Sequence, residues 1–403
     1  MNTPRLWSAA AALVLLVVAF AATTMHARGV ETRYVHTLAP QMFPQKTLGI
    51  ALQRAAFRQP DLLPLYGSSD VNVPNAHHAS ALFREYPTGF TVFPVGSIGS
   101  SSLNWVQALA AVGPDLYGKK VAVSVPVKAF MDEAVDRHAY AANFSPLHAS
   151  ALAFSTRLSF ALKQRAARRM LQFPATVAND ALLRFALERL ADGSWGSRTL
   201  YYASLPLGTL HNAVLRLRDH WETLGFLRAQ RGLRTVLPQP APLDWTELMR
   251  RAVQEARGKA THNVFGFGDD FWAAHAPEIV RQKGMYASQA TQPDVERGAE
   301  WTDFDLLLQV VRALGGEPLI LSIPLNGAYY DYLGVPAATR HAYYERLRQL
   351  AKAHEVQVVD YAEYDSDKYF SVDAGMHLSA EGWVYYDYAL DAFFHDRTLA
   401  GSE

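Results

Sequence analysis

The 403-residue sequence predicts an α/β protein whose parallel sheet is flanked by helices. Near both ends of the chain, short apolar runs alternate with helical segments in the order strand, loop, helix, strand, which is typical of parallel sheets. Half of the residues are hydrophobic, so the chain can bury a substantial core. A long middle region without this alternation predicts a helical insertion.

The first half of the sheet is predicted between about residues 60 and 130. Apolar runs predict strands over Leu62–Tyr66, Phe90–Val95 and Lys120–Val125, and a helix is expected over Leu103–Val112. From about residue 140 to 235, apolar residues recur every three to four positions, as in helices. A basic run at 163–169 is typical of a solvated helix face, and the alternative in a membrane-tethered protein is a face toward anionic head groups or polymer.

The second half of the sheet is predicted between about residues 300 and 395. A helix over Asp303–Leu314 ends at a glycine pair and leads into an apolar run at Pro318–Ile323, which predicts a buried strand. Three further elements are expected in chain order: a helix over Ala338–His354, a strand over Val356–Asp360 and a last helix from Ser379 to Phe394.

An uncharged segment, Leu6–Ala27, stands between Arg5 and Arg28. About twenty apolar residues can cross a bilayer as a helix, whereas the core of a signal peptide is usually about 7 to 15 residues long. We therefore expect an uncleaved single-pass anchor in the cytoplasmic membrane over residues 1–30, in preference to a cleaved signal. Secretory targeting then places residues 31–403 outside the cytoplasm, in the periplasm or at the cell surface.

Composition excludes several classes of function. Lys and Arg number 38, as do Asp and Glu, so no net charge draws the chain to nucleic acid. The absence of cysteine excludes disulfides, thiolate metal sites and cysteine nucleophiles. The pair His77-His78 lacks the helical two-histidine spacing of zinc sites, so we expect no metal and no cofactor.

Two distant segments carry groups suited to nucleophilic chemistry. Gly67-Ser68-Ser69-Asp70 follows the first predicted strand, and Asp373-Ala374-Gly375-Met376-His377 precedes the last predicted helix. A serine hydroxyl needs a base within hydrogen-bond reach, and that base needs a carboxylate to orient it. Because an open α/β sheet gathers the carboxyl ends of its strands at one edge, the two segments are expected to meet there.

These residues resemble a known superfamily. Ser69 in a Gly-x-Ser loop, Gly99 in a second glycine loop and a late aspartate–histidine pair resemble the SGNH (GDSL-type) hydrolases. More specifically, Pro324–Gly334 and His377–Trp383 look like the two signature stretches of the DltD family of D-alanyl-lipoteichoic acid biosynthesis proteins. The resemblance covers about 60–130 and 300–395, and it implies an SGNH-hydrolase-like, flavodoxin-like sheet.

The resemblance also implies roles for individual residues. Ser69 becomes the nucleophile, His377 the general base and Asp373 its orienting partner, while the amides of Ser69 and Gly99 form the oxyanion hole. The family's aspartate stands three residues before the histidine, at Ala374 here, so Asp373 is one residue out of place. Asp360 and Asp365 remain possible substitutes for this carboxylate, and Ser68 competes with Ser69 as the nucleophile. The third oxyanion donor is unassigned, because no asparagine follows the third predicted strand.

Five residues are expected to line the substrate site: Asp70, Lys128, Asn326, Tyr330 and Asp331. Their alternative interpretation is structural, since Asn-Gly forms turns and tyrosines pack. Asp70 or Asp331 can meet the ammonium of an alanyl group.

The leading hypothesis is serine-dependent acyl transfer, such as D-alanylation of a cell-surface polymer, with a membrane-bound O-acyltransferase and an acyl carrier system as partners implied by the family. The alternatives are an esterase or thioesterase, and a non-catalytic scaffold partner of the acyltransferase.

Overall fold

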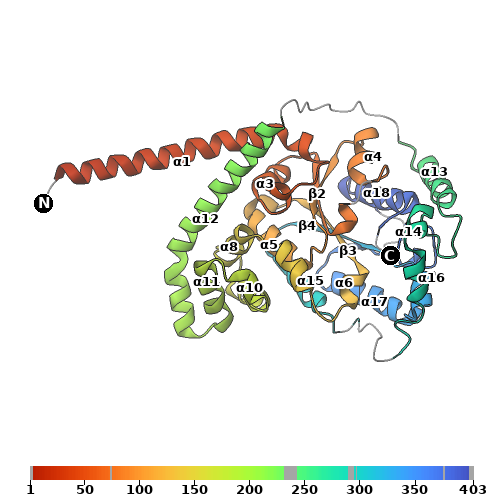
Figure 1. Ribbon diagram of the computed structural model, residues 1–403. Helices are drawn as coiled ribbons and strands as arrows, with labels where there is room; N and C mark the ends of the chain where they lie inside the picture. The colour runs from red at the N-terminus through yellow and green to blue at the C-terminus, as the bar shows by residue number, and fades with distance from the viewer. Residues whose placement is uncertain are drawn as a thin grey trace.

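The computed structural model of this chain describes residues 3–72, 75–230, 243–288, 295, 297–374 and 377–398. At its centre is a sheet of five parallel strands in the order β2-β1-β3-β4-β5 (Figure 1). The strands are β1 (Leu62–Gly67), β2 (Thr91–Gly96), β3 (Lys120–Pro126), β4 (Glu317–Ile323) and β5 (Gln357–Val359). Flavodoxin-like sheets have this order, so the predicted fold class is confirmed.

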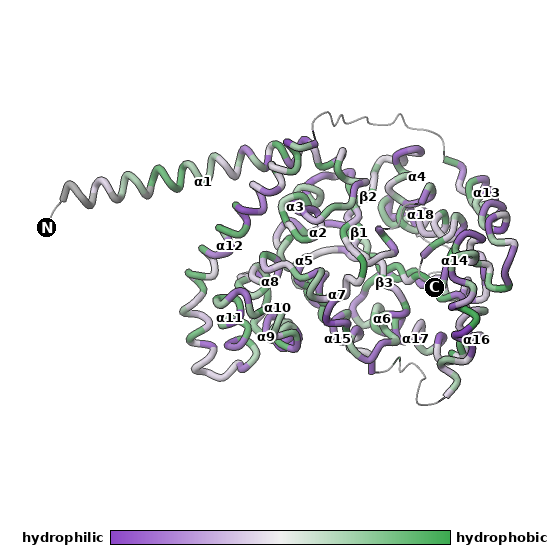
Figure 2. Tube along the Cα trace, viewed as in Figure 1, coloured by the Kyte–Doolittle hydropathy of each residue, from purple (hydrophilic) through white to green (hydrophobic). Residues whose placement is uncertain are grey.

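Both faces of the sheet are buried, which explains why its strands are continuous apolar runs (Figure 2). Neighbouring residues of a strand point to opposite faces. Thus Leu63 and Leu65 of β1 belong to one buried cluster, and Leu62 and Tyr66 to the other. The first cluster is covered by α4 (Ala79–Glu85), α13 (Trp245–Gly258) and α18 (Ala380–Phe394), the second by α3 (Ala51–Phe57), α5 (Ser102–Val112), α15 (Ala299–Ala313) and α17 (Ala337–Ala353).

The described part of the predicted helical insertion, residues 140–230, is helical, and residues 231–235 of the prediction lie outside the described residues. Most of its helices begin at a side-chain cap, since Ser159, Asp180 and Ser194 each accept a hydrogen bond from the amide three residues ahead. Two short helices, α6 (Val127–Met131) and α7 (Arg137–Ala142), lead from β3 into this region. The helices that follow are α8 (Pro146–Ala153), α9 (Phe160–Met170), α10 (Pro174–Val177), α11 (Ala181–Asp192) and the long α12 (Trp195–Ala229).

The short elements that connect these layers complete the fold. They are α2 (Pro44–Thr47), α14 (Asp269–Arg281), α16 (Gly327–Leu333) and three 3-10 turns, η1 (Ser69–Val71), η2 (Gly113–Leu116) and η3 (Ala362–Tyr364).

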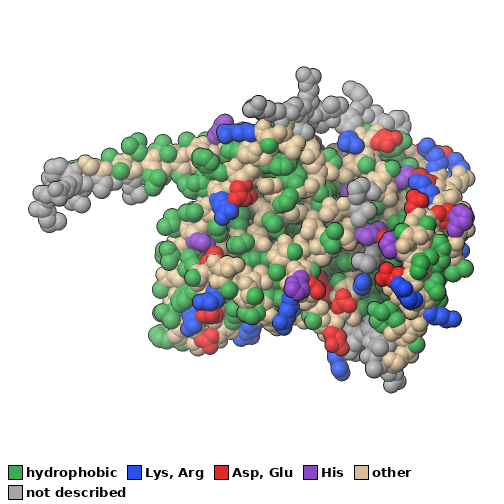
Figure 3. All heavy atoms as spheres, in the orientation of Figure 1, with side chains coloured by type: hydrophobic (Ala, Val, Ile, Leu, Met, Phe, Trp, Pro, Cys, Tyr) green, Lys and Arg blue, Asp and Glu red, His purple; other side chains and the backbone are tan. Residues whose placement is uncertain are grey.

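The amino-terminal helix α1 (Thr3–Leu38) projects from the body of the protein (Figure 1). Within the described residues, its Ala10–Leu38 part is the one helix long and apolar enough to cross a membrane. Most of its apolar side chains are exposed, as the space-filling view shows (Figure 3), and Leu15 is 68% exposed. By length and composition, α1 is therefore a candidate membrane span. It is continuous to Leu38, beyond the predicted end of the anchor at residue 30.

Candidate active site

The chain turns sharply after β1 and presents two serines at the carboxyl edge of the sheet. Ser69 begins η1; it is half-buried, and its hydroxyl makes no hydrogen bond with a described residue. Ser68 is buried, and its Oγ accepts a hydrogen bond of 3.1 Å from the Gly99 amide. The turn is held by Asp70, whose Oδ1 accepts from the Ser68 amide at 2.7 Å. The two serines therefore differ: Ser68 is engaged, and Ser69 is available.

Asp70 lies beneath this turn and not in front of it. It is 3% exposed, and burial raises the pKa of its carboxyl, against the effects of the Ser124 hydroxyl and the Ser68 amide. Its Oδ2 has no hydrogen bond of normal geometry to any described residue. The prediction that Asp70 binds substrate stays a prediction, and its burial indicates that it shapes the serine turn.

The loop after β2 is pressed against the serine turn because two glycines allow it. A Cβ on Gly96 would lie 2.0 Å from the carbonyl oxygen of Gly67, its partner in the register of β1 and β2. Gly99 has φ +76°, and a Cβ there would lie 2.7 Å from that of Ala139. Only glycine fits both positions.

Asn143, at the end of α7, holds the Gly99 loop in place. Its Oδ1 accepts from the hydroxyls of Ser97 at 2.5 Å and Ser100 at 3.1 Å, and its Nδ2 donates to the Ile98 carbonyl at 3.0 Å. The sequence reasoning missed this residue, which lies on a helix of the insertion. Because its amide nitrogen is taken up by main-chain carbonyls, Asn143 does not supply the third oxyanion donor, which stays unassigned.

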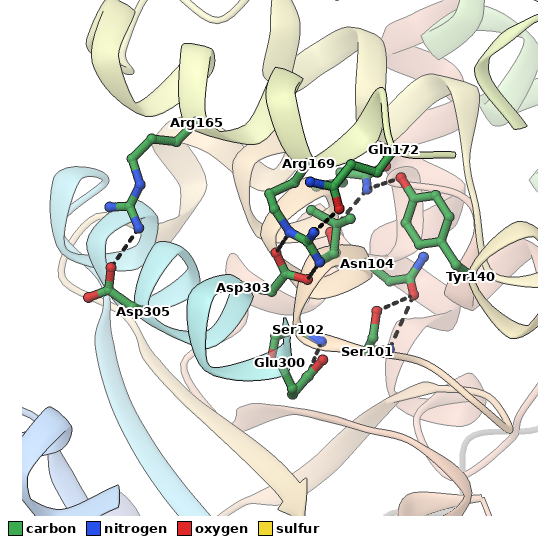
Figure 4. Close-up of polar contacts among 12 residues, drawn as sticks. Ser101, Ser102, Asn104, Tyr140, Arg165, Arg169, Gln172, Glu300, Asp303 and Asp305 are labelled. Carbon is green, nitrogen blue, oxygen red and sulfur yellow. Dashed lines mark hydrogen bonds and ion pairs between the residues drawn. The ribbon is translucent and has the colours of Figure 1, made fainter. Parts of the chain in front are cut away.

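The helix that follows the Gly99 loop is anchored by a buried carboxylate (Figure 4). Glu300 of α15 accepts a hydrogen bond of 2.7 Å from the Ser102 amide at the start of α5. Burial, followed by repulsion from Asp303, raises the pKa of Glu300 to about 7. Asp303 is bound through both oxygens by Arg169 of α9, at 2.6 and 2.7 Å. The start of α5 is thus tied through α15 to the helical insertion.

His377 is oriented by Asp373. The Nδ1 of the imidazole is hydrogen-bonded to Asp373 Oδ2, and the His377 amide donates to Asp373 Oδ1 at 3.2 Å. The bond to Asp373 raises the pKa of His377, and burial opposes it. Asp373 thus reaches the imidazole although it stands one residue before the family's position. Residues 375 and 376, between the two, lie outside the described residues.

The two substitute carboxylates are engaged elsewhere. Asp360 pairs with Arg348 at 2.7 Å, and Asp365 pairs with the buried Arg340 at 2.8 Å. Neither has a hydrogen bond to His377, so Asp373 is the carboxylate that meets the imidazole.

The second ring nitrogen of His377, Nε2, is buried and has no hydrogen-bond partner among the described residues. In particular, no hydrogen bond joins it to Ser69 Oγ. The charges of His377 and Asp70, the residue after Ser69, influence each other's pKa. The pairing of Ser69 with His377 stays a prediction.

The predicted substrate residues have different surroundings. Asn326 caps α16, accepting from the Tyr329 amide at 3.0 Å, and its Nδ2 donates to the Phe265 carbonyl at 2.7 Å, which supports the structural interpretation. Asp331 is exposed but paired with Arg340 at 2.8 Å.

Tyr330 and Lys128 differ in exposure. Tyr330 is buried, and its pKa is raised by burial and by neighbouring groups that include Asp373. Lys128 is exposed in the first turn after β3. Binding roles for Lys128, Tyr330 and Asp331 stay predictions.

Two cavities adjoin the site. One, of about 280 Å³, is lined by Ser371 and Val372 of the histidine loop and by Lys259 of the segment after α13. The other, of about 540 Å³, is lined by Val71 and Asn72 after the serine turn. Neither Ser69 nor His377 is among the described lining residues of either cavity.

The two adjacent histidines have partners within the protein. His77 binds Glu255 at 2.8 Å, and His78 binds the Ser80 hydroxyl at 2.8 Å. Among the described residues, no group of three or more His, Asp or Glu side chains can hold a metal ion.

Comparison with known proteins agrees with these features. The model of the family described as DltD protein matches residues 39–395. A protein named Protein DltD from Bacillus subtilis is 30% identical over 366 residues, which cover 91% of this chain and 89% of the relative. Proteins of the same name from Staphylococcus aureus and Lacticaseibacillus rhamnosus are 25% and 23% identical, each over 84% of this chain and over 82% and 78% of the relatives. The paired Asp373 and His377, the serine turn and the sheet beneath them thus lie within the matched region, and the chain belongs to the DltD family.

Proposed function

We propose that the protein transfers an acyl group, in the first place D-alanyl, to a hydroxyl of a cell-surface polymer through an ester of Ser69. The observation that carries the proposal is the state of His377: Asp373 holds one ring nitrogen, and the other is buried without a partner. This is the arrangement a general base needs before it takes a proton. Membership of the DltD family, which the resemblance associates with teichoic acid D-alanylation, favours D-alanyl as the group.

The proposed reaction has two halves. Ser69 Oγ attacks the acyl carbonyl of the donor while its proton passes to His377 Nε2, and the donor's leaving group departs with that proton. In the second half, Nε2 takes the proton of a polymer hydroxyl, whose oxygen attacks the Ser69 ester. The proton then returns to Ser69 Oγ. In both halves, negative charge on the carbonyl oxygen is stabilised by main-chain amides.

The Gly99 amide is the proposed oxyanion donor, together with the Ser69 amide. In the resting structure the Gly99 amide already donates to Ser68 Oγ at 3.1 Å. We propose that a substrate oxygen replaces Ser68 Oγ as the acceptor, so that Ser68 holds the loop in its reactive position until substrate binds. This assigns different roles to the two serines, and the assignment can be tested.

The proposed setting is the outer face of the cytoplasmic membrane. Helix α1 is long and apolar enough to anchor the chain, and the body of the protein would lie outside the cytoplasm. The partners proposed from the family are a membrane-bound O-acyltransferase and an acyl carrier system, which would supply the acyl group. Nucleic acid is not a proposed partner.

The experiment compares Ser69→Ala with Ser68→Ala in the full chain in detergent. A fluorophosphonate probe measures nucleophile reactivity, and a labelled D-alanyl donor with polymer acceptor measures transfer. We expect Ser69→Ala to lose both, because no other hydroxyl takes its place, and Ser68→Ala to keep probe labelling with slower transfer.

The other outcomes separate the alternatives. Labelling lost only in Ser68→Ala makes Ser68 the nucleophile. Label released as free acid in place of polymer ester indicates an esterase or thioesterase. Wild-type protein labelled no faster than Ser69→Ala indicates a non-catalytic scaffold, which the missing Ser69–His377 hydrogen bond would then explain.

A further inference from the structure

A pocket far from the serine turn lies where α1 joins the body of the protein. Its cavity of about 150 Å³ is enclosed by one face each of α1, α3 and α12. The lining residues of α1 are spaced three or four apart and therefore share one face of the helix; the last two are Arg28 and Glu31. Helix α12 contributes Arg216 and His220. In Figure 1, α1 and α12 meet at this end and diverge toward the amino terminus. The full lining is Phe20, Thr24, Arg28, Glu31, Ile50, Ala51, Arg54, Arg58, Ala213, Arg216, Leu217 and His220.

Four arginines gather at this pocket, and only part of their charge is balanced. Arg54 and Arg58 share the same oxygen of Asp115, at 2.6 and 2.8 Å. A second carboxylate, Glu31, is hydrogen-bonded to His220 at 2.6 Å. A third carboxylate, Asp219, accepts hydrogen bonds from the amides of Ile50 and Ala51 in the pocket lining, both at 2.8 Å. Four guanidinium groups therefore face three carboxylates, an excess of one positive charge when His220 is neutral.

Two of these arginines have unused binding capacity. Neither Arg28 nor Arg216 forms an ion pair with a described residue, and Arg216 Nε is buried without a hydrogen-bond partner. Burial, followed by the positive charges of Arg54 and Arg28, lowers the pKa of Arg216. An anion at this point would satisfy the unpaired donor and relieve the repulsion. Guanidinium groups bind the oxygens of phosphate with two parallel hydrogen bonds, and for this reason arginine clusters favour phosphate.

The surroundings of the pocket are apolar on the side of the candidate membrane span. Arg28 is the first charged residue after the uncharged segment Leu6–Ala27. On α12, Leu210 is 62%, Val214 56% and Trp221 61% exposed. Together with Leu217 of the pocket, these residues are spaced three or four apart and so lie on one face of α12. Hydrophobic side chains are also visible along the outer edge of α12 in Figure 3. Tryptophan and arginine next to an apolar helix are typical of the level of lipid head groups.

We propose that this pocket binds the phosphate of an anionic membrane phospholipid, with the arginines holding the head group and the exposed apolar residues of α1 and α12 contacting the acyl chains. The inference rests on the proposed membrane anchorage of α1, but not on acyl transfer. Its consequence is a fixed orientation of the body on the bilayer, because the head group links α1 to α3 and α12. A free soluble phosphate would form hydrogen bonds with the arginines but would leave the exposed apolar residues of α1 and α12 without a partner.

The test measures lipid binding by the purified full chain in nonionic detergent, with native mass spectrometry and thermal unfolding as readouts. The probes are phosphatidylglycerol, zwitterionic phosphatidylcholine and soluble glycerol phosphate. The variant is Arg28→Gln with Arg216→Gln. The matched control is Arg198→Gln with Arg218→Gln, which removes the same charge from exposed positions of α12 outside the pocket.

We expect phosphatidylglycerol to bind the wild-type chain and the control at least about tenfold more tightly than the pocket variant, the weakening that the loss of a charge-assisted hydrogen bond produces. Without lipid, the unfolding temperature of the pocket variant should be no lower than that of the control, because the variant relieves repulsion and the control loses the contacts of Arg198 and Arg218. This result excludes misfolding, and the comparison requires no enzymatic activity. Equal binding by the pocket variant and the control would overturn the proposal. Equal affinity for phosphatidylcholine, or for glycerol phosphate, would overturn the assignment to an anionic lipid.

Discussion

The buried carboxyl of Glu300 is expected to make the stability of the protein depend on pH, and the same carboxyl holds the start of α5 beside the candidate active site. Its carboxyl has a pKa raised from an ordinary 4.5 to about 7, chiefly by burial. In the range between these values, the folded protein holds a proton on Glu300 that the unfolded chain releases. Stability from this group is therefore fully present below about pH 4.5 and is lost as the pH rises through about 7. The change corresponds to roughly 3 kcal/mol, at 1.36 kcal/mol for each tenfold step.

Glu300→Gln should remove this pH dependence. The amide has nearly the same shape and can still accept from the Ser102 amide, but it does not titrate. We expect the free energy of unfolding of the variant, relative to wild type, to increase by roughly 3 kcal/mol between pH 4.5 and pH 8. The assay is urea unfolding of the full chain in nonionic detergent, followed by tryptophan fluorescence, at intervals across that range.

Asp192→Asn is the matched control. Hydrogen bonds from the hydroxyls of Ser194 and Ser197 lower the pKa of Asp192 from its ordinary 3.8. Its stabilisation is lost only as the pH falls below about 4. The control should therefore differ from wild type by a constant amount between pH 4.5 and 8. A constant difference for Glu300→Gln as well would refute the account of a buried, proton-holding carboxyl.

The same residue tests the positioning of the Gly99 loop. Glu300→Ala leaves the buried Ser102 amide without its acceptor, so the start of α5 and the loop before it are expected to shift. We expect acyl transfer to fall in Glu300→Ala and to stay near the wild-type rate in Glu300→Gln at the same pH. Equal loss in both variants would indicate that the charge matters and the hydrogen bond does not.

Three further outcomes are expected. Asp373→Asn should lower acyl transfer by on the order of 10⁴ and lower the pKa of His377, so the acidic limb of the pH–rate profile moves to lower pH; an unmoved limb would contradict the pairing. Gly99→Ala should destabilise the fold by about 1 kcal/mol or more, because φ is +76° and Ala139 lies in the way, and unchanged unfolding would show that the loop adapts. Lys46 is fully buried with its pKa well below 10.5, so wild-type stability should rise as the pH approaches 10.5 from below, and Lys46→Met should lack that rise in urea unfolding.

Local patterns in the sequence predicted most of the elements to within a few residues. The predicted helix at Leu103–Val112 is α5, and the predicted strand at Pro318–Ile323 is β4 with one more residue. These predictions succeeded because strands buried on both faces are continuous apolar runs, and helix ends are marked by caps and glycines. Helices α13 and α14 were not predicted, since α13 buries a narrow stripe and α14 contains Pro277.

The candidate site was predictable only in part. The sequence indicated the serine turn and His377 as candidates because their residue types suit nucleophilic chemistry and follow strand ends, and their catalytic roles stay predictions. The sequence left three carboxylates open as the partner of His377. In the structure Asp373 is hydrogen-bonded to the imidazole, whereas Asp360 and Asp365 pair with arginines. Asn143 was missed because an asparagine at the end of a helix has no local pattern that indicates a loop 45 residues away in sequence.

The order of strands and helices, the candidate membrane span and the types of reactive group were thus determined by the sequence itself, because each depends on neighbours along the chain. Tertiary structure decided which groups lie together: Glu300 with Ser102, 198 residues away, and the arginines of α1, α3 and α12 around one pocket. Hydrogen bonds and charges act over a few ångströms in space whatever the separation along the chain. Only folding brings such groups within range and removes the water that would otherwise weaken their interaction.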